Sequence, residues 1–359
     1  MVKHTWSKQI GAIGSGTHAS VYLAFPVTSG GGGDDTSSPI AVKSTNINYS
    51  HNLRREARIL RQLRPGCCPH IIHCFGEDVS ATPQGGRDFN LLLEYAPAGS
   101  LGGLVTPGRG RKPRIEKSDV PFYAYQILLG LRHVHDKGFV HGDLKPDNVL
   151  AFPASAGKFL LKLADFGVST LAGKKDVTYY DEDGDVYDDD DEDDEEPWCP
   201  HYCRGSLLYA APEYLATGVH NTSDDIWSLG CMVVEMLTGE PVWLCRDVND
   251  LVNQILDEKP EMPDEDVPEL ARDFLNKCFY KKECGDIEER WTARMLLRHP
   301  FILNNKDVMA CLVGSDESDD EALINDVEKD ELMSRELRQS GDGWITTEDL
   351  FLPFLSYEL

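Results

Sequence analysis

Apolar and polar positions near the start of the chain alternate between short β-type runs and turn clusters. Residues 8–14 and 20–27 are two such runs, and residues 40–44 (IAVKS) form a third after the Gly- and Ser-rich residues 28–39. Residues with β-branched and aromatic side chains favour strands, whereas glycine, serine and proline clusters mark turns. The pattern predicts a twisted antiparallel sheet with a flexible hairpin tip.

A helix is expected directly after the third strand. Apolar residues recur at helical spacing between residues 52 and 64, with charged residues between them. These apolar positions are Leu53, Ala57, Leu60 and Leu63. Residues 71–78 (IIHCFGED) and 88–97 (DFNLLLEYAP) then resume the strand pattern.

After Pro97 the pattern becomes helical. The longest predicted helix, residues 118–138, has Ser118 or Asp119 as its expected N-cap and ends at Gly138. Serine and aspartate accept hydrogen bonds from the free N–H groups at a helix start, and glycine commonly follows the last turn. Similar patterns occur in residues 223–239 and 268–279.

The order of these elements divides the chain into three parts. We expect a small sheet-rich lobe at residues 1–96, a larger helical lobe at residues 97–302 and an acidic tail at residues 303–359. Strands followed by helices are typical of the α+β class.

The composition fits a globular chain with two strongly acidic segments. Hydrophobic residues make up 41% of the 359 positions, which suffices to bury a core. Residues 176–196 carry 14 acidic and no basic side chains, and residues 302–359 carry 15 acidic and four basic ones. Of the formal charge of −26, only −1 falls on the other 280 residues. A basic surface for nucleic acid is therefore not expected.

Targeting signals and disulfide frameworks are not expected either. No window approaches twenty uninterrupted apolar residues, and the first residues lack an apolar run behind their positive charges. The ten cysteines lack framework-like spacing, so we expect reduced thiols in an intracellular protein of the cytoplasm and/or nucleus. Two clusters leave a metal-binding regulatory protein as an alternative. They are Cys67, Cys68, His70, His73 and Cys74, and Cys199, His201 and Cys203.

Candidate phosphate-binding residues appear in the sheet-rich lobe. Residues 13–21 (IGSGTHASV) lie between the first two predicted strands and contain Gly14 and Gly16. Glycine lets backbone N–H groups approach phosphate oxygens, because no Cβ intervenes. Lys43 follows on the third strand, and the next helix offers Glu56 on one face. A lysine that binds phosphates needs such a carboxylate to fix its rotamer.

Three further motifs follow in order. HGDLKPDNVL occupies residues 141–150, ADFG residues 164–167 and APE residues 211–213. Together with the glycine-rich loop and the strand lysine, they make the chain resemble a eukaryotic protein kinase over residues 6–302. This resemblance implies the α+β bilobal protein kinase fold, with a small β-rich N-lobe and a larger helical C-lobe, and the use of ATP and Mg²⁺.

The resemblance also implies individual roles. Asp143 would accept or orient the proton of the substrate hydroxyl, and Lys145 would neutralise charge near the γ-phosphate. Asn148 and Asp165 would hold Mg²⁺. The implied ATP-binding residues are Ile13, Gly14, Ser15, Gly16, Val21, Ala41, Lys43, Glu56, Leu93, Glu94, Ala96 and Leu150.

Several other residues match serine/threonine kinases in particular. Lys145 in DLKPDN and Ser206 in RGSLLYAAPE both favour a serine or threonine substrate. In the family pattern Glu213 would pair with Arg290, and Asp225 would anchor the catalytic loop. These last three residues would hold the site in register.

Two departures from the family pattern stand close to the site. Ala19 replaces the third glycine of the loop, and Gly142 replaces the arginine that usually precedes the catalytic aspartate. In many relatives that arginine pairs with a phosphate on the activation loop. The resemblance therefore does not imply that a phosphate on the activation loop orders this loop in the present chain.

Within the superfamily, the chain resembles plant-type MAP kinase kinase kinases of the MEKK-like group. The similar segments are IAVKS, REARILRQL followed by PHII, and LLLEYAPAGSLGGLV. The resemblance implies protein substrates, above all MAP kinase kinases, and neither nucleic acid nor membrane as a partner. A catalytically weak pseudokinase or scaffold is the alternative. It predicts the loss of Lys43, Asp143, Asn148 or Asp165, and all four are present.

Each acidic segment leaves two interpretations open. Residues 176–196 lengthen the activation segment, which runs from Asp165 to Glu213. They form either a solvated loop or a charged element. The charged element would attract a basic docking region or substitute for a phosphate. The tail is either a disordered acidic spacer or a docking segment. Its apolar candidates for docking are Trp344, Ile345, Leu350, Phe351 and Phe354.

Overall fold

The computed structural model describes residues 6–15, 19–26, 38–64, 68–82, 84–106, 114–175, 179–180, 186–187, 205–262, 267–281 and 290–314. The chain divides into two units, residues 1–308 and 309–359. Of the second unit, residues 309–314 are described, and they form the end of helix α10 (Lys306–Gly314).

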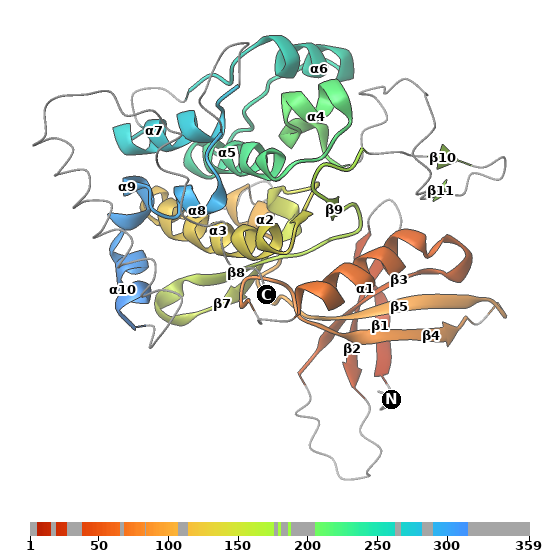
Figure 1. Ribbon diagram of the computed structural model, residues 1–359. Helices are drawn as coiled ribbons and strands as arrows, with labels where there is room; N and C mark the ends of the chain where they lie inside the picture. Colours follow the sequence, from red (N-terminus) through yellow and green to blue (C-terminus); the bar gives the residue numbers. More distant parts are fainter. Residues whose placement is uncertain are drawn as a thin grey trace, which may run out of the picture. The chain divides into compact units, whose positions relative to one another are not determined.

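The first unit begins with a five-stranded antiparallel sheet, and helix α1 (His51–Leu63) lies beside it (Figure 1). The strand order is β1-β2-β3-β5-β4. The strands are β1 (Trp6–Ser15), β2 (Ser20–Pro26), β3 (Ile40–Asn46), β4 (Cys74–Ala81) and β5 (Arg87–Glu94). The four apolar positions that predict α1 are all buried. The predicted sheet and helix are thus confirmed.

Strand β4 begins later than the sequence pattern predicts. Ile71 and Ile72 lie outside it, although residues 71–78 have a strand pattern. The Ile72 N–H donates to the carbonyl of Leu163 at 2.9 Å, and the Leu163 N–H donates to the carbonyl of His70 at 2.8 Å. The backbone of residues 70–72 therefore pairs with the second lobe, which makes it a link between the lobes.

Helices form the second lobe, and α3 (Val120–Asp136) and α5 (Thr222–Thr238) pack against each other within it (Figure 1). Every residue of α5 from Asp224 to Leu237 is buried. The remaining helices of this lobe are α2 (Leu101–Val105), α4 (Pro212–Thr217), α6 (Val248–Asp257), α7 (Glu269–Cys278), α8 (Ala293–Leu296) and α9 (Pro300–Leu303). The predicted α+β architecture is confirmed.

The start of α3 differs from the predicted capping. Asp119 occupies the N-cap position, but its side chain makes no capping hydrogen bond within the described part of the chain. The Asp119 carboxylate pairs with Lys158 instead, and a 3-10 turn, Lys117–Asp119, leads into the helix. At its other end α3 stops at Asp136, and Gly138 follows with a φ of +79°, as the sequence predicts.

Short two-stranded ribbons connect the helices. They pair β6 (Phe139–Val140) with β9 (Thr170–Leu171), β7 (Val149–Pro153) with β8 (Phe159–Leu163), and β10 (Tyr179–Tyr180) with β11 (Val186–Tyr187). Strands β10 and β11 lie within the acidic residues 176–196, where the sequence predicts only a loop. The rest of that segment and residues 28–37 of the predicted hairpin tip lie outside the described residues.

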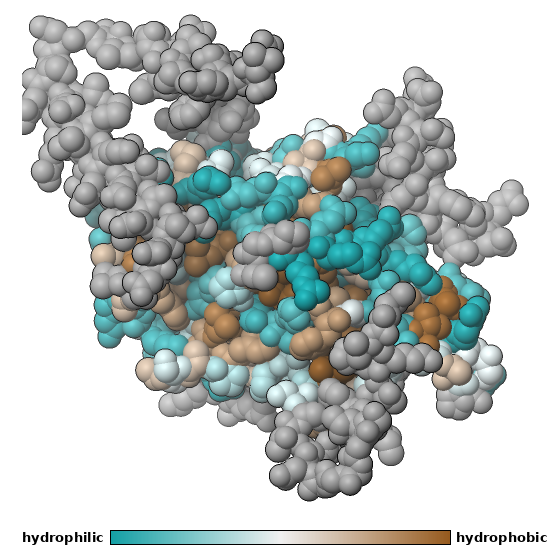
Figure 2. Space-filling model, turned by 60° about the horizontal axis from the view of Figure 1, so that its bottom comes forward, coloured by the Kyte–Doolittle hydropathy of each residue, from teal (hydrophilic) through white to brown (hydrophobic). Residues whose placement is uncertain are grey.

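The face of the molecule seen in Figure 2 is mostly hydrophilic where it is described, and its hydrophobic residues form separate small groups. Among the described residues, none of the helices combines the length and the apolar character needed to cross a membrane.

Gly230 on α5 provides a test of how tightly the helical lobe is packed. A Cβ at this position would lie 2.7 Å from Phe279 Cε1 and 2.8 Å from Cys278 Cβ. Alanine favours a helix by about 1 kcal/mol over glycine, whereas overpacking a core costs about 1–3 kcal/mol. We expect Gly230→Ala to lower the free energy of unfolding by about 1 kcal/mol, measured by chemical denaturation.

Gly103→Ala on α2 is the matched control. A Cβ there would meet its nearest neighbour, Ser100 Oγ, only at 3.8 Å. The control should be neutral or slightly stabilising. A more stable Gly230→Ala protein would contradict the tight packing around α5.

Candidate active site

Three segments that are far apart in the sequence meet at Lys43. Lys43 lies on β3, and its Nζ is 2.8 Å from Glu56 Oε2 on α1 and 2.8 Å from Asp165 Oδ1, which follows β8. The predicted pairing of Lys43 with Glu56 is therefore confirmed. The third partner, Asp165, joins the sheet-rich lobe to the helical lobe at the same ammonium group.

Lys43 stabilises the charge of both carboxylates, while burial and the nearby Asp165 carboxylate raise the pKa of Glu56 above its ordinary value. Burial favours neutral lysine, but the carboxylates of Glu56 and Asp165 outweigh it and raise the pKa of Lys43 well above its ordinary value. Burial would also raise the pKa of Asp165, yet the Lys43 ammonium holds it below the ordinary range. Lys43 is thus a permanent cation and Asp165 an anion at neutral pH.

The backbone at Asp165 is strained in a way that orients its carboxylate. Its φ is +63°, a left-handed conformation that is uncommon for residues other than glycine. The next residue, Phe166, is fully buried, and its ring lies 4.8 Å from the ring of His141. The packed ring holds the strained backbone in place, so the carboxylate faces Lys43.

Residues 141–148 bring Asp143, Lys145 and Asn148 together. Asp143 Oδ2 accepts hydrogen bonds from Lys145 Nζ at 2.8 Å and from Asn148 Nδ2 at 2.9 Å. Lys145 Nζ also donates to Ser206 Oγ at 2.7 Å. The predicted neighbourhood of Ser206 and the catalytic loop is confirmed, and Lys145 is the side chain that connects them.

The buried carboxylate of Asp225 on α5 holds this loop. Its Oδ2 accepts from the His141 N–H at 2.8 Å and its Oδ1 from the Gly142 N–H at 3.0 Å, so the predicted anchoring is confirmed. His135 Nε2 on α3 lies 2.8 Å from Asp225 Oδ2. Burial opposes ionisation of Asp225, but its hydrogen bond with His135 and the nearby charges hold its pKa below the ordinary value.

The donor set at Asn148 and Asp165 suits a hard divalent cation. Asn148 makes its hydrogen bonds to Asp143 through Nδ2, so its amide oxygen is left as an acceptor. Asp165 bonds Lys43 through Oδ1, which leaves Oδ2 as a second oxygen. Mg²⁺ prefers oxygen ligands and often takes one or two carboxylates together with substrate phosphates. The residues present fit such an ion.

The residues assigned to adenine binding lie on β2, β3, β5 and β7. Leu93 is buried, and Val21, Ala41 and Leu150 are half-buried. Ala41 on β3 is paired with Leu93 on β5, which sets these two side chains at one level of the sheet. Ala96 follows β5 and is half-buried.

Glu94, for which the resemblance to protein kinases implies a backbone contact with adenine, has its side chain engaged elsewhere. One carboxylate oxygen accepts from the His73 N–H at 2.6 Å, and Lys162 Nζ lies 2.7 Å from the same oxygen. Because its carboxylate is held at the junction of the lobes, Glu94 can contact an adenine ring only through its backbone. That is the contact that the resemblance implies.

The glycine-rich loop is only partly described. Ile13 and Gly14 are exposed on β1, and Ser15 is the last residue of that strand. Gly16 lies outside the described residues.

Two residues near the site are absent from the predictions based on sequence. His135 bonds the anchor Asp225, as described above. Gly205 has a φ of +91°, and a Cβ there would lie 2.7 Å from the Gly142 carbonyl oxygen and 3.3 Å from Asp143 Oδ1. The position of Gly205 directly before Ser206 is the sequence signal that could have identified it.

The pair of Glu213 and Arg290 is also confirmed. Arg290 NH1 bonds Glu213, and its NH2 lies 3.2 Å from the second carboxylate oxygen of the same residue. The guanidinium further donates to the carbonyls of Ser223 and Tyr280, so it ties the APE motif to α5 and to the segment after α7.

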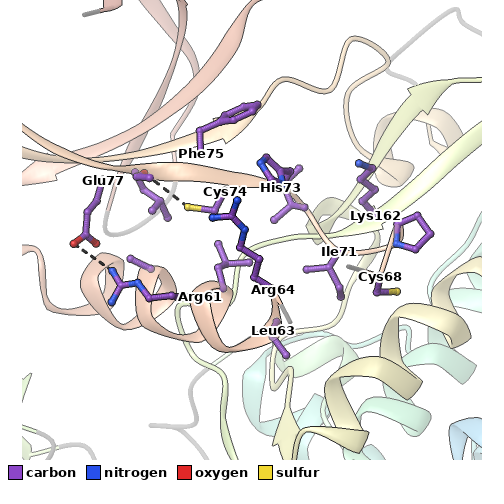
Figure 3. A pocket seen from close by; sticks show the side chains of 16 residues that line it. Arg61, Leu63, Arg64, Cys68, Ile71, His73, Cys74, Phe75, Glu77 and Lys162 are labelled. Atoms are coloured by element: carbon purple, nitrogen blue, oxygen red, sulfur yellow. Dashed lines mark hydrogen bonds and ion pairs between the residues drawn. The ribbon is translucent and has the colours of Figure 1, made fainter. Parts of the chain in front are cut away.

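Three residues of the first cysteine and histidine cluster, Cys68, His73 and Cys74, line a pocket between α1 and β4 (Figure 3). Cys68 Sγ bonds the carbonyl of Leu129 and Cys74 Sγ that of Gly76, and the two thiols point in opposite directions in Figure 3. His70 Nδ1 lies 2.9 Å from the carbonyl oxygen of Leu161. Among the described residues, His, Cys, Asp and Glu form no group of three that could hold a metal ion. Cys67, Cys199, His201 and Cys203 lie outside them.

Comparison with known proteins gives one family and several close relatives. The family described as Protein kinase domain matches residues 7–302. Mitogen-activated protein kinase kinase kinase 20 of Arabidopsis thaliana is 36% identical over 295 residues, which cover 81% of this chain and 76% of the relative. Mitogen-activated protein kinase kinase kinases 17 and 18 of the same plant are 33% and 34% identical, over 84% and 82% of this chain and 70% and 76% of their own lengths.

Replacement of Asp225 by asparagine tests the anchor. The variant keeps one acceptor oxygen, but its amide would face donor groups, so we expect the free energy of unfolding to fall by about 3 kcal/mol near neutral pH. Because the pKa of Asp225 is lowered in the folded state, its stabilising effect is present above the unfolded value of about 3.9. It is lost as the pH falls through the folded pKa. The difference between wild type and variant should therefore shrink below about pH 4.

Denaturant unfolding at several pH values measures this difference. Asp136→Asn is the control, since Asp136 forms an exposed ion pair with Arg294 that should contribute less than about 1 kcal/mol. Equal losses for the two variants would show that the Asp225 carboxylate does not anchor the loop.

Proposed function

The chain belongs to the protein kinase family, and we propose that it transfers the γ-phosphate of ATP to serine or threonine hydroxyls of proteins. Family membership itself implies the use of ATP and a divalent cation, with proteins as substrates. The observation that best supports the finer proposal is Lys145, whose ammonium group bonds both Asp143 and Ser206.

The catalytic loop would supply the groups that accept the proton and stabilise the charge of the transferred phosphoryl group. Asp143 would accept the proton of the attacking hydroxyl as the new O–P bond forms. Its Oδ2 is held by Lys145 and Asn148, so the carboxylate is fixed before the substrate arrives. Lys145 would offset the negative charge that develops on the transferred phosphoryl group.

The sheet-rich lobe would position the nucleotide. Lys43 is a permanent cation whose rotamer is fixed by Glu56, so its ammonium group is placed for the α- and β-phosphates. Val21, Ala41 and Leu150 would enclose the adenine ring. A Mg²⁺ ion held by Asn148 and Asp165 would neutralise phosphate charge when bound.

The resemblance to plant relatives suggests a place in a signalling cascade. Relatives of 33% to 36% identity are mitogen-activated protein kinase kinase kinases, and they align over most of this chain. We therefore propose MAP kinase kinases as substrates. The alternative of a catalytically weak scaffold gains no support, because Lys43, Asp143, Asn148 and Asp165 are all present and the described geometry brings each to the site.

Asp143→Asn tests the assigned chemistry. The amide keeps the size of the side chain but cannot accept the proton, so we expect kcat to fall by about 10²–10⁴-fold. Nucleotide affinity should be unchanged, because Lys43 and Asp165 remain. The assay measures transfer of phosphate from radiolabelled ATP to a MAP kinase kinase and to a generic basic protein. Analysis of the product identifies the phosphorylated amino acid.

Two outcomes would contradict the proposal. Phosphotyrosine as the main product would remove the serine/threonine assignment. Nucleotide binding without transfer by the wild-type chain would favour the scaffold.

Gly205→Ala tests how closely the activation segment must approach the catalytic loop. The new Cβ would meet the Gly142 carbonyl oxygen at 2.7 Å, so the segment or the loop has to shift. A displacement near 1 Å at a reacting group lowers catalysis by about 10²-fold. We expect kcat to fall by that order, measured with the same transfer assay.

Gly173→Ala is the control for the backbone strain. Gly173 also has a positive φ, +81°, but no atom lies within 4 Å of the position that a Cβ would take. An activity loss shared by both variants would show that strain, and not contact with the loop, is responsible.

A further inference from the structure

A small cavity lies beside the candidate catalytic aspartate. It has a volume of about 20 Å³, and residues of the catalytic loop, the end of the activation segment and α5 line it. Asp143 comes from the loop, Ser206 from the segment and Asp224 from α5. The cavity therefore lies where these three elements meet.

Two carboxylate oxygens at this cavity have no hydrogen-bond partner among the described residues. They are Asp143 Oδ1 and Asp224 Oδ1, and both atoms are buried. The other oxygen of each group is bonded: Asp143 Oδ2 by Lys145 and Asn148, and Asp224 Oδ2 by the Asn221 N–H at 2.8 Å. His220 also lines the cavity, and its Nδ1 lies 3.7 Å from the other oxygen, Asp224 Oδ2. Because a buried acceptor without a donor is costly, the two Oδ1 atoms call for a donor inside the cavity.

The size of the cavity limits what can supply those donors. A water molecule needs about 10–15 Å³ of such space, whereas ligand pockets hold about 300–1,000 Å³. One water molecule fits, and its two hydrogens match the two acceptors. Buried waters make about three hydrogen bonds. Ser206 can supply the third, because its oxygen accepts from Lys145 and its own hydroxyl proton remains available.

We propose that one buried water molecule bridges Asp143 Oδ1 and Asp224 Oδ1, and that Asp224 is thereby a positioning residue for Asp143. Lys145 and Asn148 hold one oxygen of the catalytic carboxylate, and the bridge takes one lone pair of the other, whose second lone pair is left for the proton of the substrate hydroxyl. The kinetic part of this inference rests on the proposed function, while the bridge itself does not.

The helix-capping role of Asp224 does not explain its second oxygen. Asn221 and Asp224 form a reciprocal capping box at the start of α5, and this uses only Oδ2 of Asp224. Asn221 is not among the residues that line the cavity. Asn221→Ala therefore weakens the same cap without removing a partner of the water molecule, and it is the matched control.

The test combines a crystal structure of the full chain at about 1.8 Å resolution or better with the kinetics of three variants. We expect density for one water molecule within hydrogen-bond distance of both carboxylate oxygens. Asp224→Ala should lower kcat by about tenfold with an unchanged KM for ATP, because Lys43 and Asp165 are untouched. Asn221→Ala should stay within about twofold of the wild-type kcat while losing a similar amount of thermal stability.

Asp224→Asn should restore activity close to the wild-type level. Its amide oxygen can accept from the Asn221 N–H while its NH₂ group donates to the water molecule. This variant and the wild-type structure keep the inference testable if Asp224→Ala does not fold.

An empty cavity in the wild-type structure would overturn the bridge. Equal kcat values for Asp224→Ala and Asn221→Ala would overturn the positioning role. If the wild-type chain phosphorylates no protein, the proposed function fails, whereas the density still decides the bridge by itself.

Discussion

The buried carboxylate of Asp225 fixes the backbone on which the candidate catalytic side chains stand. It accepts hydrogen bonds from two consecutive N–H groups, at His141 and Gly142, directly before Asp143. Helix α5 can carry this charge into the core because donors surround it, which is the condition for a buried ion. His135 supplies the third contact from α3. One carboxylate thus couples the two central helices of the lobe to the loop that carries the candidate catalytic residues.

The same rule of paired charges explains the junction between the lobes. Three charged groups meet at Lys43, and no two of them come from the same element. Without the lysine, Glu56 would be a buried anion close to the carboxylate of Asp165, and it would have to take up a proton. With it, the sheet, α1 and the strained backbone at Asp165 are held in one arrangement. The cluster that we propose to position the phosphates is therefore also the cluster that joins the lobes.

Most of this architecture could be predicted from the sequence, because local patterns determine it. Helical spacing in residues 52–64 and the ordered motifs from Lys43 to Glu213 identify the elements and the site. The late start of β4 could not be predicted, since Ile71 and Ile72 are as apolar as strand residues and only the pairing with Leu163 removes them from the sheet.

The cap of α3 and the role of Gly205 could not be predicted for a similar reason. Asp119 is a good N-cap residue by type, but Lys158 on a distant segment takes its carboxylate. Gly205 is identified by its close approach to the catalytic loop at Gly142, which is a contact between segments far apart along the chain and not a local pattern. Tertiary contacts decided each of these cases.

The glycine at position 142 changes how the activation segment can be held. Its φ of +77° suits glycine, and no guanidinium group extends from it toward a phosphate. Hydrogen bonds hold the described ends of the activation segment instead. The Gly173 N–H donates to the His220 carbonyl, the His220 N–H donates to the Lys174 carbonyl, and Arg55 Nε donates to the Ser169 carbonyl.

At the far end of the segment, Ser206 bonds Lys145, and Ser228 Oγ donates to the carbonyl of Tyr209. None of these contacts involves a group that phosphorylation would have to create. Both described ends of the segment are therefore anchored by permanent donors and acceptors of the fold, and the 14 negative charges of residues 176–196 lie between two fixed points. A phosphate–arginine pair at position 142 is not needed to bring Ser206 to the catalytic loop, because Lys145 already does so.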